Sequence, residues 1–171
     1  MTFSELAASR YSVRKFKPDP IEEEILTAIL QAGRVAPTAC NYQPQKVFVV
    51  RTAELRENLA KASPCTFDAP VILVICFDKD RQATIPSRPG YTFGEVDATI
   101  VCTHMMLQAW ELGIGSCWVG MFNDQEVSQM LNLPENLQVS ALLPIGYPAE
   151  NARPAKLHSS IRPAEETITY L

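Results

Sequence analysis

The pattern of apolar and polar positions predicts a chain that alternates helices with short strands. We expect helices over residues 3–9, 21–33, 53–62, 97–112 and 125–131, and strands over residues 46–51, 71–77, 116–119 and 139–145. The second helix is the clearest, because its isoleucines and leucines repeat at helical spacing, and Gly33 is expected to end it. Residues 71–77 are instead apolar without interruption, which is typical of a strand buried on both faces.

Two segments carry more apolar surface than one small chain can cover. The helix over 97–112 has apolar residues around most of its circumference, and such a helix is usually buried on most sides. Residues 165–171 are predicted to form an extended tail with Ile168 and Tyr170 on one face, and a lone strand is not stable in water. We therefore expect a second copy of the chain to contact both segments.

The order of these elements indicates one α+β domain over residues 1–171, with a central mixed or antiparallel sheet flanked by helices. An apolar content of 47% and a charged content of 20% are typical of a globular protein. The longest apolar run, residues 69–77, is too short to span a bilayer, so we expect no membrane partner. A net charge of −4 argues against a nucleic-acid partner.

The expected location is the cytoplasm. The first residues lack the charged start and apolar stretch of a signal peptide. The five cysteines are odd in number and form no C-x-x-C pair, so we expect reduced thiols.

Two segments near the start of the chain carry the candidate chemistry. Residues 9–16 combine cations with hydroxyl groups, and residues 36–44 contribute Asn41 and Gln43. Guanidinium groups bind phosphate oxygens, and amides suit the polar edge of an aromatic ring, so the set fits flavin mononucleotide (FMN). Taken alone, the first segment also fits a solvated charged stretch, and the second an ordinary turn between a helix and a strand.

Three motifs carry a family resemblance. Residues 10–16, RYSVRKF, resemble the RRSxRxF opening of nitroreductase-like flavoproteins. Residues 36–44, APTACNYQP, resemble their APSxxNxQPW segment, and residues 112–120, LGIGSCWVG, resemble their LGxGxCWxG turn. The three motifs occur in the family's order and extend over most of the chain.

The resemblance implies an FMN site at the interface of an intertwined homodimer. The residues that it assigns to the cofactor are Arg10, Tyr11, Ser12, Arg14, Pro37, Thr38, Ala39, Asn41, Gln43, Cys117, Trp118, Val119, Gly120 and Arg162. The segment that contains residues 37–43 is implied to reach the flavin of the other subunit. A backbone N–H of Val119 or Gly120 is implied to face the flavin N5 atom.

Near its C-terminus the chain departs from the family pattern. Ser159 and Ile161 occupy the positions of two spaced basic residues that bind the flavin phosphate in many members. Arg162, Lys156 and His158 are the candidate substitutes.

The implied activity is ping-pong oxidoreduction. NAD(P)H reduces the flavin, and a nitroaromatic, quinone or related planar acceptor then reoxidises it. The alternatives are a specialised reduction on the same fold, such as dehalogenation, and a flavin-binding protein without turnover. Residues 80–93 are the candidate loop over the flavin, where Tyr91 and Phe93 offer a stacking surface.

No side chain is expected to act as a catalytic group or to bind a metal. Cys102 and His104 are two residues apart, so they do not share a helix face. The glycines at 113 and 115 do not form a dinucleotide fingerprint, because Trp118 stands where the third glycine is required.

Overall fold

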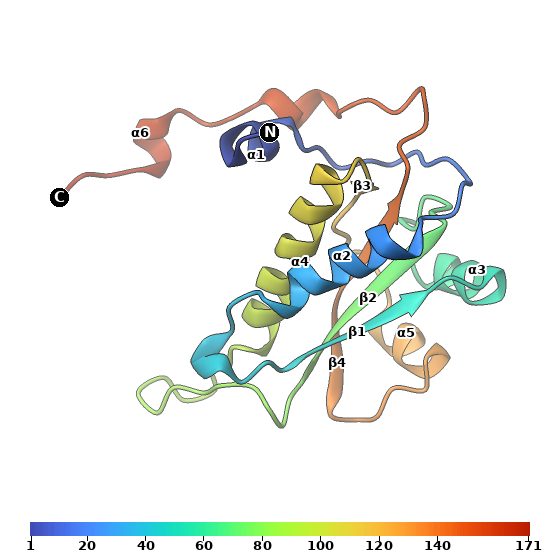
Figure 1. Cartoon of the computed structure of the whole chain (residues 1–171). Helices are drawn as coiled ribbons and strands as arrows, with labels where there is room; N and C mark the ends of the chain where they lie inside the picture. The colour runs from blue at the N-terminus through green and yellow to red at the C-terminus, as the bar shows by residue number, and fades with distance from the viewer.

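The apolar run near residue 75 becomes the central strand of a four-stranded sheet with helices on both faces (Figure 1). This computed structural model describes all 171 residues. The strands are β1 (Gln45–Val50), β2 (Val71–Asp78), β3 (Gly115–Ser116) and β4 (Leu137–Gly146), in the spatial order β1-β2-β4-β3. All three pairings are antiparallel, which confirms the predicted α+β class.

Alternate residues of β2 form two separate cores. Leu73 and Ile75 face α2 (Glu23–Arg34) and α4 (Gly94–Glu111), and both side chains are fully buried. Residues 72, 74 and 76 pack on the other face, against α3 (Ala53–Ala62) and α5 (Asp124–Met130). The prediction of a strand buried on both faces is therefore confirmed, and α4 is fixed against the sheet at the centre of the molecule.

The first helix, α1 (Phe3–Ser9), has the predicted bounds. The Thr2 hydroxyl accepts from the Glu5 N–H, and the Glu5 carboxylate accepts from the Thr2 N–H, which completes a capping box. None of the helices has the length and hydropathy needed to cross a membrane.

The C-terminal tail differs from the prediction. It begins with the 3-10 turn η2 (Lys156–Ser159), and α6 (Ala164–Thr167) interrupts the stretch that was expected to be extended. Two acidic residues in the first turn of α6 favour the helix dipole, and the Ile168 N–H donates to the Ala164 carbonyl at 2.7 Å. The tail passes α1 and leaves the body of the molecule (Figure 1).

Gly33 does not end α2, contrary to the prediction. It lies inside the helix where α2 crosses α4, and a Cβ atom there would lie 2.8 Å from the Met105 Cγ atom and 3.3 Å from Val101. The glycine therefore permits the close approach of the two helices. Gly113, with a φ of +77°, follows the end of α4 as predicted.

Gly33→Ala tests this close packing. Alanine normally stabilises a helix interior by about 1 kcal/mol relative to glycine. Here the added methyl group overpacks the α2–α4 contact, which typically costs about 1–3 kcal/mol. We expect a lower free energy of unfolding in urea, whereas Thr27→Ala on the exposed face of α2 should raise it slightly. A more stable Gly33→Ala variant would contradict the packing argument.

Candidate functional site

The first candidate segment lies along the outer edge of β3. The Val13 N–H donates to the Ser116 carbonyl at 2.9 Å, and Ser12 forms a parallel bridge with Ser116. The Val13 side chain is fully buried against Gly115, where a Cβ atom would lie only 2.7 Å from Val13. Backbone bonding and one buried valine thus hold the cationic motif in place.

The charges of this motif influence the Cys117 thiol. Burial raises the pKa of the Cys117 thiol, while the Arg14 guanidinium, a hydrogen bond from Ser12 and the Arg10 guanidinium each oppose that rise. Geometry places Ser12 and Arg14 in this neighbourhood, because Ser12 bridges to Ser116 and the Arg14 side chain donates to the Ser12 carbonyl. The assignment of these residues to the cofactor stays a prediction.

The strand edge next to Cys117 is partly open. Val119 uses its backbone groups within the sheet, since its N–H donates to the Leu142 carbonyl at 2.9 Å and its carbonyl accepts from the Leu142 N–H at 3.0 Å. The residues on either side, Trp118 and Gly120, are exposed, and their N–H groups donate no hydrogen bond within the chain. Of the two N–H groups expected to face a cofactor, only that of Gly120 is free.

The second candidate segment, residues 37–43, forms a tight loop around the 3-10 turn η1 (Ala39–Asn41). The Gln43 N–H donates to the Thr38 hydroxyl at 3.0 Å, and the Gln43 side-chain amide donates to the side-chain oxygen Oδ1 of Asn41 at 3.0 Å. Cys40, Asn41 and Gln43 have φ values of +53°, +54° and +51°, so the loop holds three left-handed residues. The Asn41 and Gln43 side chains are exposed and available to a ligand.

Asp97 holds this loop from the first turn of α4. Its Oδ1 atom accepts from the Ala39 N–H at 2.9 Å, the side chain is 1% exposed, and its Oδ2 atom has no hydrogen-bond partner. No motif or periodicity in the sequence indicates a role for Asp97. The available signal was one acidic residue between Val96 and Ala98 at the start of an apolar helix.

The two segments lie at opposite ends of α4 (Figure 1). At the C-terminal end, the Trp110 indole N–H donates to the Ser9 hydroxyl at 2.9 Å, next to the first segment. At the N-terminal end, Asp97 binds the second segment. The thirteen helical steps from Asp97 to Trp110 correspond to about 20 Å. One chain therefore does not bring its two candidate segments together.

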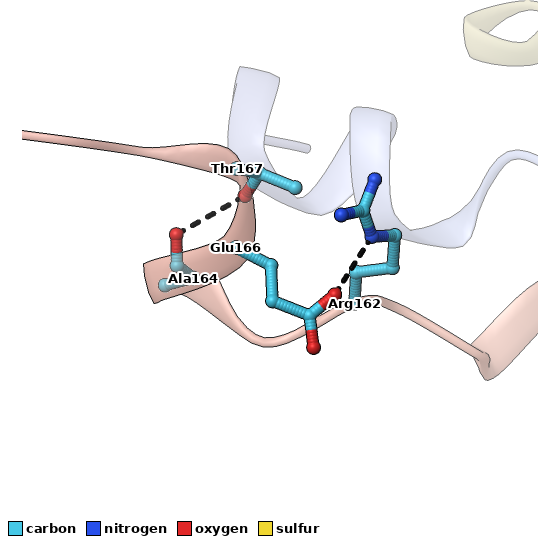
Figure 2. A network of polar contacts seen from close by, with 4 residues as sticks. All are labelled: Arg162, Ala164, Glu166 and Thr167. Carbon is cyan, nitrogen blue, oxygen red and sulfur yellow. Dashed lines mark hydrogen bonds and ion pairs between the residues drawn. The ribbon is translucent and has the colours of Figure 1, made fainter.

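The C-terminal basic residues lie in different surroundings. Arg162 pairs with Glu166 at 3.0 Å, and both side chains are more than half exposed (Figure 2). The His158 ring lies 6.1 Å from the Tyr11 ring, next to the first segment. The assignment of Arg162 to the cofactor stays a prediction.

Cys102 and His104 are not placed for acid–base or nucleophilic chemistry. Burial raises the pKa of the Cys102 thiol to about 12, so it does not ionise at neutral pH. The His104 ring contacts the Ile100 carbonyl of its own helix at 2.9 Å through Nδ1. The structure contains no group of three or more potential metal-binding side chains.

A family model, solved structures and a sequence relative all indicate the same family. A family model described as "Nitroreductase family" matches residues 7–67 and 60–147. A nitroreductase family protein of Clostridium difficile 630 has a TM-score of 0.93 and 37% identity, covering 99% of this chain and 98% of that one. An FMN-dependent nitroreductase of Clostridium difficile R20291 has a TM-score of 0.82 and 26% identity, covering 98% of each chain. A Methanothermobacter thermautotrophicus protein, provisionally named NADH dehydrogenase/NAD(P)H nitroreductase, is 30% identical, covering 88% of this chain and 80% of its own length.

Asp97→Ala and Asp97→Asn test how the loop is held. Alanine leaves the Ala39 N–H without an acceptor, which should lower the free energy of unfolding by about 1–3 kcal/mol. Asparagine keeps the acceptor, so its effect should be smaller. We expect hydrogen exchange at the Ala39 amide to accelerate in the alanine variant and to stay slow in the asparagine variant. Equal exchange in both variants would show that Asp97 does not hold the loop.

Proposed function

The chain belongs to the nitroreductase family, and we propose that it is an FMN-dependent oxidoreductase that transfers reducing equivalents from NAD(P)H to small planar acceptors. The observation that carries this proposal is the cationic motif held against an open strand edge. The motif supplies positive charge, and the edge supplies free backbone donors. Both are suited to a planar cofactor with an anionic end.

The cations of the motif are free to bind a ligand. Arg10 and Arg14 form no ion pair, and the single hydrogen bond of the Arg14 side chain goes to the Ser12 carbonyl at 3.2 Å. Guanidinium groups without a carboxylate partner can donate to a phosphate or to the carbonyl edge of a flavin ring. The site contains one such cationic motif and no dinucleotide fingerprint, which supports FMN rather than FAD.

The strand edge is suited to orient the flavin ring. Trp118 is 41% exposed, and its indole provides an apolar surface beside the free N–H groups of Trp118 and Gly120. When bound, FMN accepts a hydride from NAD(P)H and passes electrons to the acceptor. The chain's own contribution is to hold the ring and donate hydrogen bonds to it, without supplying an acid or base.

We further propose that the functional unit is a homodimer in which residues 37–43 of one chain complete the site of the other. Supporting this, α4 carries a stripe that its own chain leaves partly exposed: Val96, Ile100, Thr103, Leu107 and Trp110. The stripe repeats at alternating intervals of four and three residues, the spacing of packed helix pairs. In the tail, Ile161 is 88% exposed and Tyr170 is 94% exposed, so a second chain could cover both.

The loop before α4 supports the proposal of a planar acceptor. Tyr91 and Phe93 pack edge-to-face at 5.2 Å beside a cavity of about 590 Å³ at the start of α4, and they provide a surface for a planar acceptor.

The five free cysteines fit a reducing compartment, and we propose the cytoplasm.

Absorbance, cofactor chromatography and turnover together test the proposal. Purified protein should show a flavin spectrum, and heat should release FMN. With a quinone present, the protein should oxidise NADH or NADPH through many turnovers. A protein that binds FMN without turnover would instead be a flavin-binding protein. Bound FAD, or no flavin after reconstitution, would contradict the proposal itself.

Arg10→Ala tests the motif. The loss of a charge-assisted hydrogen bond typically costs about 1.5–3 kcal/mol, so FMN should bind about 10-fold to 100-fold more weakly in a fluorescence titration. Arg51→Ala is the matched control, since Arg51 is an exposed arginine that pairs with Glu23 outside the proposed site. The control should bind FMN like the wild type. Equal affinity in the two variants would show that Arg10 does not contact the cofactor.

A further inference from the structure

A hollow with a positively charged wall lies beside the cationic motif. It has a volume of about 440 Å³ and is lined by Arg14, Lys15, Asn151, Ala152, Arg153 and Ala155. Three of these six residues are cationic and none is acidic, in a chain whose net charge is −4. Such a local excess of positive charge favours an anionic ligand.

Backbone contacts hold the two walls of the hollow together. The Ala149 N–H donates to the Lys15 carbonyl at 3.0 Å, and the Ala152 N–H donates to the Ala149 carbonyl at 2.9 Å. The Arg153 guanidinium donates through Nη1 to the carbonyls of Glu150 and Ala152, at 2.8 and 2.7 Å. Arg153 is therefore fixed through one of its nitrogens, and its other N–H groups stay free.

The charges of the wall are not neutralised within the chain. The two ion pairs of the structure lie elsewhere, and the hydrogen bonds of Arg14 and Arg153 go only to backbone carbonyls. Lys15 is exposed and borders the hollow. Two guanidinium groups and one ammonium thus line an open space with no anion among their partners.

We propose that this hollow binds a phosphate monoester, with Arg14 and Arg153 as hydrogen-bond donors and Lys15 as a third charge. A phosphate monoester carries about −1.5 to −2 charges at neutral pH and has three acceptor oxygens, which suits three cations. The proposal rests on the proposed function, which supplies two such ligands. FMN carries a 5′-phosphate that riboflavin lacks, and NADPH carries a 2′-phosphate that NADH lacks.

Arg153→Gln and Lys15→Gln test the hollow, because glutamine removes the charge and keeps a polar chain. Dissociation constants for FMN and riboflavin are measured by fluorescence, and KM values for NADPH and NADH are measured with a quinone. We expect about tenfold weaker binding of one phosphorylated ligand and unchanged binding of its unphosphorylated counterpart. Arg51→Gln is the control, and thermal unfolding verifies that each variant is folded.

The ligand that loses affinity identifies the source of the phosphate. A loss confined to FMN assigns the hollow to the cofactor, and a loss confined to NADPH assigns it to the nicotinamide substrate. Unchanged binding of all four ligands, or equal losses for FMN and riboflavin together with equal losses for NADPH and NADH, would overturn the proposal.

Inorganic phosphate tests the hollow without a flavin. Its ³¹P resonance should broaden with the wild-type protein and less with Arg153→Gln, at constant ionic strength. Phosphate binding by a protein that binds no flavin would contradict the proposed function and leave the hollow standing. Flavin turnover by a protein that does not discriminate phosphorylated from unphosphorylated ligands would support the proposed function and contradict the phosphate site in the hollow.

Discussion

The position of α4 is the constraint on which the site depends. The helix is buried against the sheet and α2, so its length fixes how far apart the segments at its two ends lie. Ser9 contacts its last turn and Ala39 its first, about 20 Å apart by helical rise. Two copies of α4 packed antiparallel around a twofold axis would place the first segment of one chain beside the second segment of the other. The same arrangement would cover the exposed stripe of α4, which explains why the proposed site and the proposed dimer depend on each other.

Alternate residues of the sheet edge beyond β3 have different roles. One residue pairs within the sheet, and its two neighbours are available to the proposed cofactor. Val119 uses its N–H and carbonyl to pair with Leu142, while the N–H groups of Trp118 and Gly120 point away from that pairing and stay free. Because backbone donors are fixed by the strand, they need no reorganisation when a ligand arrives. This division of roles is suited to an enzyme whose chemistry takes place on the cofactor, and it agrees with the elevated thiol pKa values and with a histidine bonded within its own helix.

Much of the fold could be predicted from the sequence, because apolar periodicity reports burial directly. The central strand and the helices had clear patterns, and the structure contains them. The errors have physical causes. Gly33 was expected to end a helix, but its close contact with Met105 depends on tertiary packing that local sequence does not show. The turn at α6 was missed because the apolar residues of the tail suggested a strand. Asp97 and Arg153 act through long-range contacts or backbone turns, which produce no periodic signal.

Mixed dimers test whether each site combines the cationic motif of one chain with residues 37–43 of the other. One chain would carry Arg10→Ala and the other Asn41→Ala with Gln43→Ala, each with its own affinity tag, and heterodimers would be isolated after coexpression. If sites form between chains, one site of each heterodimer receives all the substitutions and the other receives none. FMN titration should therefore find one site per heterodimer with wild-type affinity. A heterodimer in which no site has wild-type affinity would show that each chain builds its site alone, which would contradict a site shared between chains.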